Sequence, residues 1–187
     1  NNYLLELSNL NIPFYFVDNH NSDFSINLFS QLKIDCLVNA GTTRKISSKL
    51  LDKKNIPQGV INIHPGKLPE YRGCSAVEWA LLNDDQIFNT IHYMDENYDT
   101  GPIIELESYE FNKESTYNDI RSDVYLKGIN LMCCVLKKFQ DKKFSPKDAQ
   151  EQNNINAKYW KPIPLNLEDH AIEKANNKKY IFQTLRN

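Results

Sequence analysis

The sequence predicts an α/β protein with a Rossmann-like, mostly parallel sheet flanked by helices. Two observations lead to this prediction. Short apolar segments alternate with helix-like amphipathic segments through residues 12–140, as expected for strand–loop–helix units. Three of the apolar segments also run directly into polar turns, at residues 39–44, 62–64 and 94–99. Ligands of parallel sheets bind where the strands end, so these turns are the expected place for a functional site.

The individual elements are assigned from spacing and capping signals. Residues 3–10 resemble the end of a helix, and the apolar residues 12–17 are expected to form a strand. Apolar residues at helical spacing follow Ser22, which can cap a helix near residues 24–32. Further strands are expected at 34–39, 59–64, 88–94 and 103–111, with helices at 47–51 and 75–82. A capping box of Thr116 with Asp119 opens a long helix that extends to Gln140.

Composition narrows the class of protein. The 187 residues are 41% hydrophobic, which is enough for the core of one domain. A net charge of −2 with scattered lysines and arginines predicts a small-molecule partner and no nucleic acid. The four cysteines lack the spacing of a metal site, so we expect no metal, and they favour the reducing cytoplasm. No apolar run approaches the roughly 20 residues of a membrane span, so no membrane partner is expected.

Asn62 and His64 are the first candidates for catalysis. They lie two residues apart at the end of an apolar run, so both side chains point to one face of a strand, and Ile63 points to the other. An amide can donate hydrogen bonds to a developing oxyanion, and an imidazole can move a proton. The turn at residues 95–102 contains Asp99, a carboxylate that could partner the imidazole. Purely structural roles at a strand end and in a turn are the alternative.

These motifs resemble a known family. The run NIHPGKLPEYRG at residues 62–73, the helix 76–82, the strand 90–94 and DTGP at 99–102 are similar to formyltransferases that use 10-formyltetrahydrofolate. The resemblance covers residues 12–139. It implies that Asn62, His64 and Asp99 meet in space as the catalytic residues. It also implies a catalytic domain at residues 1–145, with 146–187 as a C-terminal extension packed on it, and an expectation that N-terminal units of the family fold are missing.

The resemblance also implies where 10-formyltetrahydrofolate would bind as formyl donor. Its flat pterin needs a narrow slot with polar backbone groups at the edge. One wall of this slot is expected from a loop whose Thr42 and Thr43 are smaller and more polar than is usual in the family, and the other from the acidic turn. The expected cofactor-binding residues are Thr43, Arg44, Lys45, Ile46, Met94 and Asp95.

The acceptor is expected to be a primary amine, and amino-sugar nucleotide N-formyltransferases resemble this chain most. They are similar around residues 71–73 and 77–79, and they continue into an aromatic, proline-containing segment like 159–164. A nucleotide-linked amino sugar is therefore the expected acceptor, and a homodimer is left open. Phosphoribosylglycinamide formyltransferase, methionyl-tRNA formyltransferase and formyltetrahydrofolate hydrolase are alternatives. A non-catalytic binding module of the same fold is a further one.

Overall fold

The computed structural model describes residues 3–42 and 44–185. A four-stranded sheet has the order β1 (Cys36–Asn39), β2 (Gly59–His64), β4 (Ile87–Tyr93) and β5 (Ile103–Tyr109). Strands β1 and β2 are parallel, whereas β2 with β4 and β4 with β5 are antiparallel. The predicted α/β class with flanking helices is confirmed, but the sheet is mixed instead of mostly parallel. The short acidic turn accounts for the β4–β5 pair, because a short connection joins antiparallel neighbours, whereas the direction of β4 against β2 is decided by the tertiary structure.

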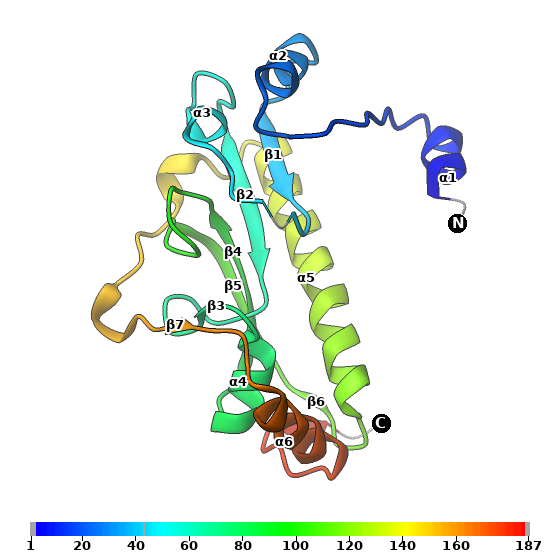
Figure 1. Ribbon diagram of the computed structural model, residues 1–187, viewed down its shortest axis with the longest axis vertical. Helices are drawn as coiled ribbons and strands as arrows, with labels where there is room; N and C mark the ends of the chain where they lie inside the picture. Colours follow the sequence, from blue (N-terminus) through cyan, green and yellow to red (C-terminus); the bar gives the residue numbers. More distant parts are fainter. Residues whose placement is uncertain (1–2, 43, 186–187) are drawn as a thin grey trace.

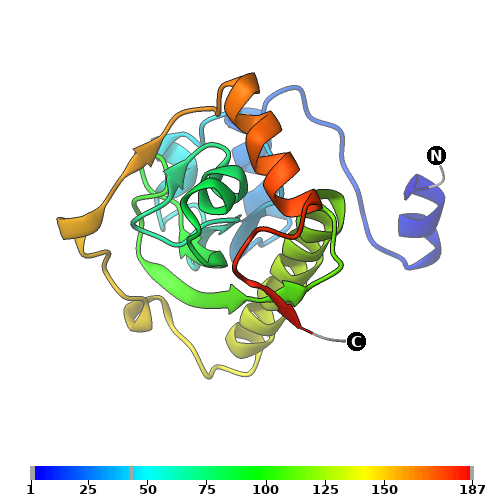
Figure 2. The same cartoon turned by 90° about the horizontal axis from the view of Figure 1, so that it is seen from below.

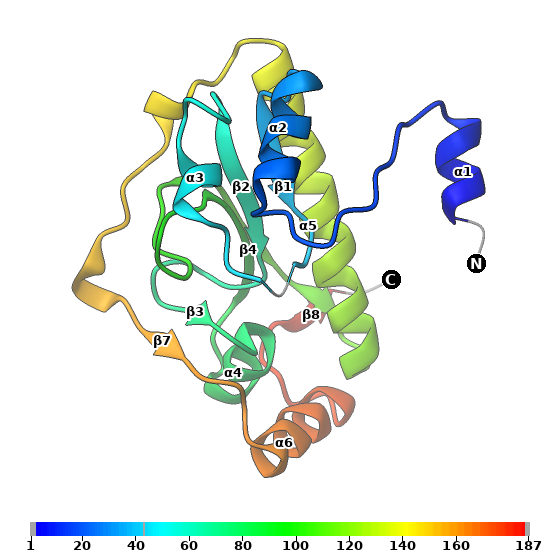
Figure 3. The same ribbon diagram turned by 45° about the horizontal axis from the view of Figure 1, so that its top comes forward.

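Helices cover the sheet. The long helix α5 (Tyr117–Gln140) lies along one face (Figure 1), and its apolar residues Ile120, Val124, Leu131 and Val135 are buried. Its capping box is formed as expected. Helix α2 (Asp23–Gln31) and helix α3 (Ser48–Leu51) lie near β1 (Figure 3). Helix α4 (Ala76–Asn83) follows the loop after β2.

The C-terminal residues pack on the rest of the chain. The short strand β7 (Tyr159–Trp160) pairs with β3 (Arg72–Gly73), and β8 (Gln183–Leu185) pairs with β6 (Phe111–Asn112). Helix α6 (Leu165–Asn176) packs beside α4 (Figure 2), and its Ala171 is fully buried. The 3-10 turns η1 (Pro146–Asp148) and η2 (Asn154–Asn156) connect α5 to β7. A domain boundary at residue 145 stays a prediction.

The prediction of a strand at residues 12–17 is wrong. This segment has no regular secondary structure, and it joins helix α1 (Tyr3–Asn9) to the rest of the chain (Figure 1). The side chain of Phe16 is 81% exposed. A strand needs a neighbouring strand for its backbone hydrogen bonds, and none of the described strands pairs with these residues.

None of the helices in the described ranges is both long and apolar enough to cross a membrane. Helix α5 has 24 residues, but charged residues such as Lys127 and Lys137 interrupt its sequence. The cytoplasmic location expected from the sequence stays a prediction.

Candidate active site

The structure brings Asn62, His64 and Asp99 into one cluster. Asn62 and His64 lie at the C-terminal end of strand β2, and Asp99 lies in the turn that follows β4. Nδ1 of His64 is 3.6 Å from Oδ2 of Asp99. Oδ1 of Asp99 is 3.6 Å from Nε2 of His92, which is in turn 3.2 Å from Nδ2 of Asn62. The expected convergence is therefore present, and a second histidine lies between Asn62 and Asp99.

The sequence predicted that the turn with Asp99 follows the end of another parallel strand, and the structure differs. Strand β4 is antiparallel to β2, so the acidic turn does not extend from a third parallel strand end. The turn instead folds back over β4, where the Tyr93 N–H donates to the Pro102 carbonyl at 2.9 Å. Gly101 allows this close approach, because a Cβ there would lie 2.0 Å from the Tyr93 carbonyl oxygen. The Gly73 N–H donates to Oδ2 of Asp99 at 2.8 Å and holds the carboxylate.

His64 is arranged to act as a base. Its Nε2 lies 2.5 Å from the Tyr71 carbonyl oxygen, which can only accept, so the ring proton is on Nε2 and the lone pair of Nδ1 faces Asp99. Burial lowers the pKa of His64 by more than Asp99 and the Tyr71 carbonyl raise it. The contact with Asp99 expected from the sequence is present, but the ring is only 5% exposed, and this burial favours its neutral form before any proton is transferred.

Asp99 is ionised over the whole physiological range. Burial alone raises its pKa, but the nearby His92 and His64 rings and the Gly73 N–H outweigh this and lower it to about 2. Its backbone is in the left-handed region, with φ of 56°. Aspartate tolerates this conformation better than most residues. The cluster therefore has a fixed negative charge beside a neutral imidazole.

Sequence reasoning missed two residues of this cluster. His92 is not among the site residues predicted from the sequence, but its side chain is buried and lies directly across from Asn62 in the pairing of β2 with β4. Asn39 lies across from Asn62 on the other side, in the pairing of β1 with β2, and its Nδ2 donates to Oδ1 of Asn62 at 2.9 Å. Strand register would have revealed both, but register cannot be read from one strand alone.

The loop expected to bind the cofactor (residues 44–46, here called the cofactor loop) lies opposite the acidic turn at residues 95–102. Thr43 falls outside the described residues. Nζ of Lys45 is 5.9 Å from the centroid of the Tyr98 ring, so the loop and the turn face each other. The Arg44 guanidinium donates to the Asp18 carbonyl at 2.8 Å, and Ile46 is buried with only 7% exposure.

The two candidates from the acidic turn have structural contacts. Met94 packs with the apolar cluster beneath the loop, and its N–H donates to the Val60 carbonyl at 2.8 Å. The Asp95 carboxylate accepts from the Thr100 hydroxyl at 2.6 Å and from the Asn97 N–H at 2.9 Å. Asp95 thus closes the turn that presents Asp99.

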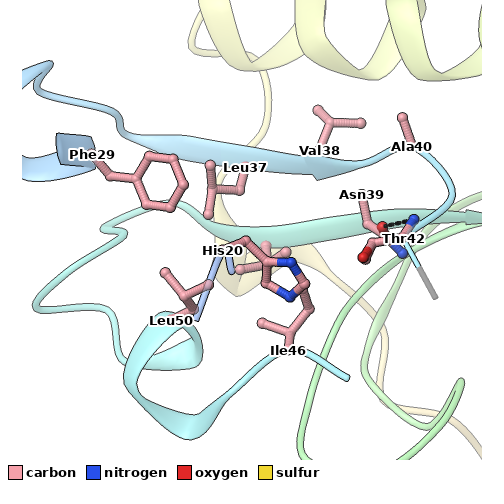
Figure 4. A pocket seen from close by; sticks show the side chains of 10 residues that line it. His20, Phe29, Leu37, Val38, Asn39, Ala40, Thr42, Ile46 and Leu50 are labelled. Carbon is pink, nitrogen blue, oxygen red and sulfur yellow. Dashed lines mark hydrogen bonds between the residues drawn. The ribbon is translucent and has the colours of Figure 1, made fainter. Parts of the chain in front are cut away.

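A cavity of about 340 Å³ lies between α2, β1 and the cofactor loop. Its walls are mostly apolar, and Figure 4 shows the His20 ring among these side chains, with Asn39 and Thr42 joined by a hydrogen bond at one end. Nε2 of His20 is buried and has no hydrogen-bond partner within residues 3–42 and 44–185. The apolar lining includes Phe29, Leu37, Ile46, Leu50 and Val60.

A second cavity, of about 360 Å³, lies beside Asp99. It is lined by Thr100 from the acidic turn, by Arg72 from β3, and by Lys158 and Tyr159 around β7. The Arg72 guanidinium donates to the amide oxygens of Gln152 and Asn154 at 2.6 and 2.7 Å. Among the described side chains it forms no ion pair, so its positive charge is not neutralised there.

The fold and this cluster define a class of protein, an α/β protein with an amide, an imidazole and a carboxylate gathered at the end of a strand. The family model described as Formyl transferase matches residues 17–136, and the chain belongs to this family. Methionyl-tRNA formyltransferase from Halothermothrix orenii is 29% identical over 143 residues, which are 76% of this chain and 44% of the relative. The chain thus spans less than half the length of that curated relative.

Two solved structures show the same fold. The formyltransferase PseJ from Anoxybacillus kamchatkensis, solved with UDP-4,6-dideoxy-4-formamido-L-AltNAc and tetrahydrofolate, has a TM-score of 0.68. It is 17% identical, and the match covers 98% of this chain and 95% of the other. Phosphoribosylglycinamide formyltransferase from Bacillus halodurans has a TM-score of 0.60 and 29% identity, covering 75% and 76% of the two chains.

Proposed function

We propose that this protein transfers a formyl group from 10-formyltetrahydrofolate to a primary amine carried by a nucleotide-linked amino sugar. The observation that supports this most strongly is the cluster of Asn62, His64 and Asp99. Its groups match the needs of the reaction, which are a donor for the oxygen that gains charge, a base for the amine proton and a fixed anion. Membership of the formyl transferase family supports the same activity.

The cluster favours an amine because its acceptor atoms converge. Nδ1 of His64 lies 3.6 Å from Oδ2 of Asp99, and among the described residues the Gly73 N–H is the donor within hydrogen-bond distance of that carboxylate. An ammonium group has three N–H donors and a positive charge. Such a group would satisfy these acceptors and be attracted by Asp99. His64 is neutral and can then take up the proton that the ammonium must lose before it attacks.

The cavity at Asn39 fits the pterin of the donor. Its volume of about 340 Å³ is within the usual range for ligand pockets, and its walls are apolar with a few polar groups. The unpartnered Nε2 of His20 is a further polar atom at this wall. Ile46 lines it, and Arg44, Lys45, Met94 and Asp95 are its expected neighbours on the loop and turn. Bound there, 10-formyltetrahydrofolate supplies an electrophilic formyl carbon.

The cavity beside Asp99 suits the acceptor. Arg72 is held by two amide oxygens and has no carboxylate partner among the described residues, so it is ready to bind an anion such as a diphosphate. Lys158 adds a second positive charge, and the exposed Tyr159 ring can pack against a base or sugar. Lys67, a cation five residues before Arg72 in the chain, already pairs with Glu70 at 3.0 Å.

The roles of the three residues follow from their contacts. His64 takes a proton from the amine through Nδ1 and, as an imidazolium beside Asp99, holds it until the leaving nitrogen accepts it. Asn62 donates from Nδ2 to the formyl oxygen as negative charge develops there. Asp99 stabilises the positive charge on His64 and orients the amine. Removing one such oxyanion donor typically lowers kcat about 10²- to 10³-fold.

The test is a comparison of amines. The purified protein is incubated with 10-formyltetrahydrofolate, and tetrahydrofolate release is followed with UDP- and dTDP-linked amino sugars, glycinamide ribonucleotide, methionyl-tRNA or no amine. Release that depends on an amino-sugar nucleotide is the expected result. Release that never depends on an amine would remove the transferase proposal. Discharge by water alone would indicate formyltetrahydrofolate hydrolase.

One second candidate has specific support. Phosphoribosylglycinamide formyltransferase from Bacillus halodurans is 29% identical to this chain and is matched over most of its own length. Its acceptor, as the name states, is also a phosphorylated amine, which Arg72 could bind in the same way. The amine comparison separates the two. The homodimer stays a prediction, and size-exclusion chromatography with light scattering would test it.

A further inference from the structure

Three polar side chains form a row across the sheet. Asn39 on β1, Asn62 on β2 and His92 on β4 are cross-strand partners, so their side chains lie on one face. Nδ2 of Asn39 is 2.9 Å from Oδ1 of Asn62, and Nδ2 of Asn62 is 3.2 Å from Nε2 of His92. A backbone group closes each end of the row. Thr42 donates its N–H to Oδ1 of Asn39 at 3.1 Å, and Nδ1 of His92 is 2.7 Å from the Tyr93 carbonyl oxygen.

The two ends determine the direction of every hydrogen bond between them. The Thr42 N–H can only donate, so Asn39 presents its oxygen there and its NH₂ to Asn62. Asn62 must then accept with Oδ1, which turns its own NH₂ toward His92. The Tyr93 carbonyl can only accept, so His92 has its proton on Nδ1 and accepts from Asn62 at Nε2. All four contacts agree with this assignment. Oδ1 of Asp99 is also near Nε2 of His92, but at 3.6 Å it lies farther away than Nδ2 of Asn62 at 3.2 Å.

We infer that Asn39 and His92 are positioning residues that orient the Asn62 amide so that one N–H of its NH₂ group is free for the reacting oxygen. If the amide were reversed, its oxygen would face that developing negative charge and repel it. The inference rests on the proposed function, because it concerns the oxyanion donor of that reaction. Neither residue needs to contact substrate, since each acts through Asn62.

The hydrogen-bond assignment has a readout besides activity. The protein is labelled with ¹⁵N-histidine, and the His92 signal is identified by its loss in the His92→Gln variant. We expect the Nδ1–H tautomer of His92 near neutral pH. The Nε2–H tautomer would overturn the inference, because Nε2 could then not accept from Asn62. This measurement does not depend on whether the protein is a formyltransferase.

Kinetics tests the effect on Asn62. Asn39→Asp keeps the acceptor for Thr42 but replaces the donor to Asn62 with a second acceptor. The side-chain amide of Asn62 is therefore expected to rotate so that its NH₂ group faces residue 39. We expect kcat to fall about tenfold or more, as for loss of one oriented hydrogen bond, with KM for both substrates within about threefold of wild type. Asn177→Asp makes the same change on an exposed residue and is the control.

The same assay compares two variants of His92. The Gln side chain offers an oxygen where Nε2 accepts, so His92→Gln should retain several-fold more activity than His92→Leu. Equal kcat for the two, or an unchanged kcat in Asn39→Asp, would overturn the positioning role. Asn62→Ala separates this failure from failure of the proposed function. If Asn62→Ala itself keeps full kcat, the proposed oxyanion donor is wrong. If it loses activity while the Asn39 and His92 variants do not, only the positioning role is wrong.

Discussion

Nε2 of Gln152 donates a hydrogen bond to the main-chain oxygen of Asp99 at 3.0 Å, and a second to the Gly101 oxygen at 2.7 Å. Its Oε1 accepts from the Arg72 guanidinium. One side chain from the residues after α5 therefore holds both the turn that presents Asp99 and the arginine beside it. Gln152, from the residues after α5, therefore contacts the backbone of the turn that carries Asp99.

Replacing Gln152 with Ala should weaken this turn. Two carbonyl groups lose their partner and Arg72 keeps only Asn154, so the free energy of unfolding should fall by about 1–2 kcal/mol, and kcat should fall as Asp99 shifts. Urea unfolding and steady-state kinetics measure the two effects. Gln150→Ala, two residues away with an exposed side chain, is the control. A Gln152→Ala variant with wild-type kcat would show that the turn keeps its shape without this contact.

His64→Gln should separate catalysis from folding. The Gln amide can keep the donor to the Tyr71 carbonyl, but it has no basic atom in the place of Nδ1. Loss of a general base typically lowers the rate about 10²- to 10⁴-fold, and we expect kcat to fall in this range with little change in thermal midpoint. His64→Ala would be a poorer test, because removing the buried ring would leave a cavity that lowers stability. The exposed His170→Gln is the control, and equal kcat in both variants would contradict the role of His64.

The free energy of unfolding should depend on pH, because Asp99 has a lower pKa in the folded state than in the unfolded state. The pKa of Asp99 is lowered to about 2 from an ordinary 3.8, so the folded state binds this proton more weakly than the unfolded state. The resulting stabilisation, about 2 kcal/mol, is complete above pH 4 and is lost as pH falls toward 2. Asp99→Asn should be less stable than wild type at pH 7, and the difference should vanish near pH 2.

Urea unfolding at a series of pH values tests this difference. Asn is the suitable replacement because it also tolerates the left-handed backbone at residue 99. His64 acts in the same direction at higher pH, since its lowered pKa makes the folded state lose stability as pH falls below about 6.5. Asp23→Asn on the surface of α2 is the control. A constant difference between wild type and Asp99→Asn from pH 7 to pH 2 would contradict the lowered pKa.

Blocking the cavity at Asn39 should raise KM for the formyl donor and leave KM for the amine unchanged. Thr42 is at its exposed rim, so Thr42→Trp can place a large ring over the opening while the backbone N–H keeps its bond to Asn39. We expect KM for 10-formyltetrahydrofolate to rise about tenfold or more, because lost ligand contacts of this size cost at least about 1.4 kcal/mol. The exposed Lys53→Trp is the control. A larger effect on KM for the amine would place the acceptor in this cavity instead.

Local sequence signals predicted much of this molecule. The capping box of Thr116 with Asp119, the Ser22 cap and the apolar face of α5 depend on residues within a few turns of each other, and all are present. The alternation that places Asn62 and His64 on one face of β2 is equally local. The strand expected at residues 12–17 failed because strand formation depends on a partner elsewhere in the chain.

The sequence by itself determined which chemical groups are available, namely an amide and an imidazole two residues apart and a carboxylate in a glycine-containing turn. Tertiary structure alone decided the direction of β4, the register that places Asn39 and His92 on either side of Asn62, and the contact of Gln152 with the acidic turn. The physical reason is that pairing between strands and burial of the His64 ring depend on residues far apart in the chain. Burial then decides that this histidine is neutral, which no local pattern records.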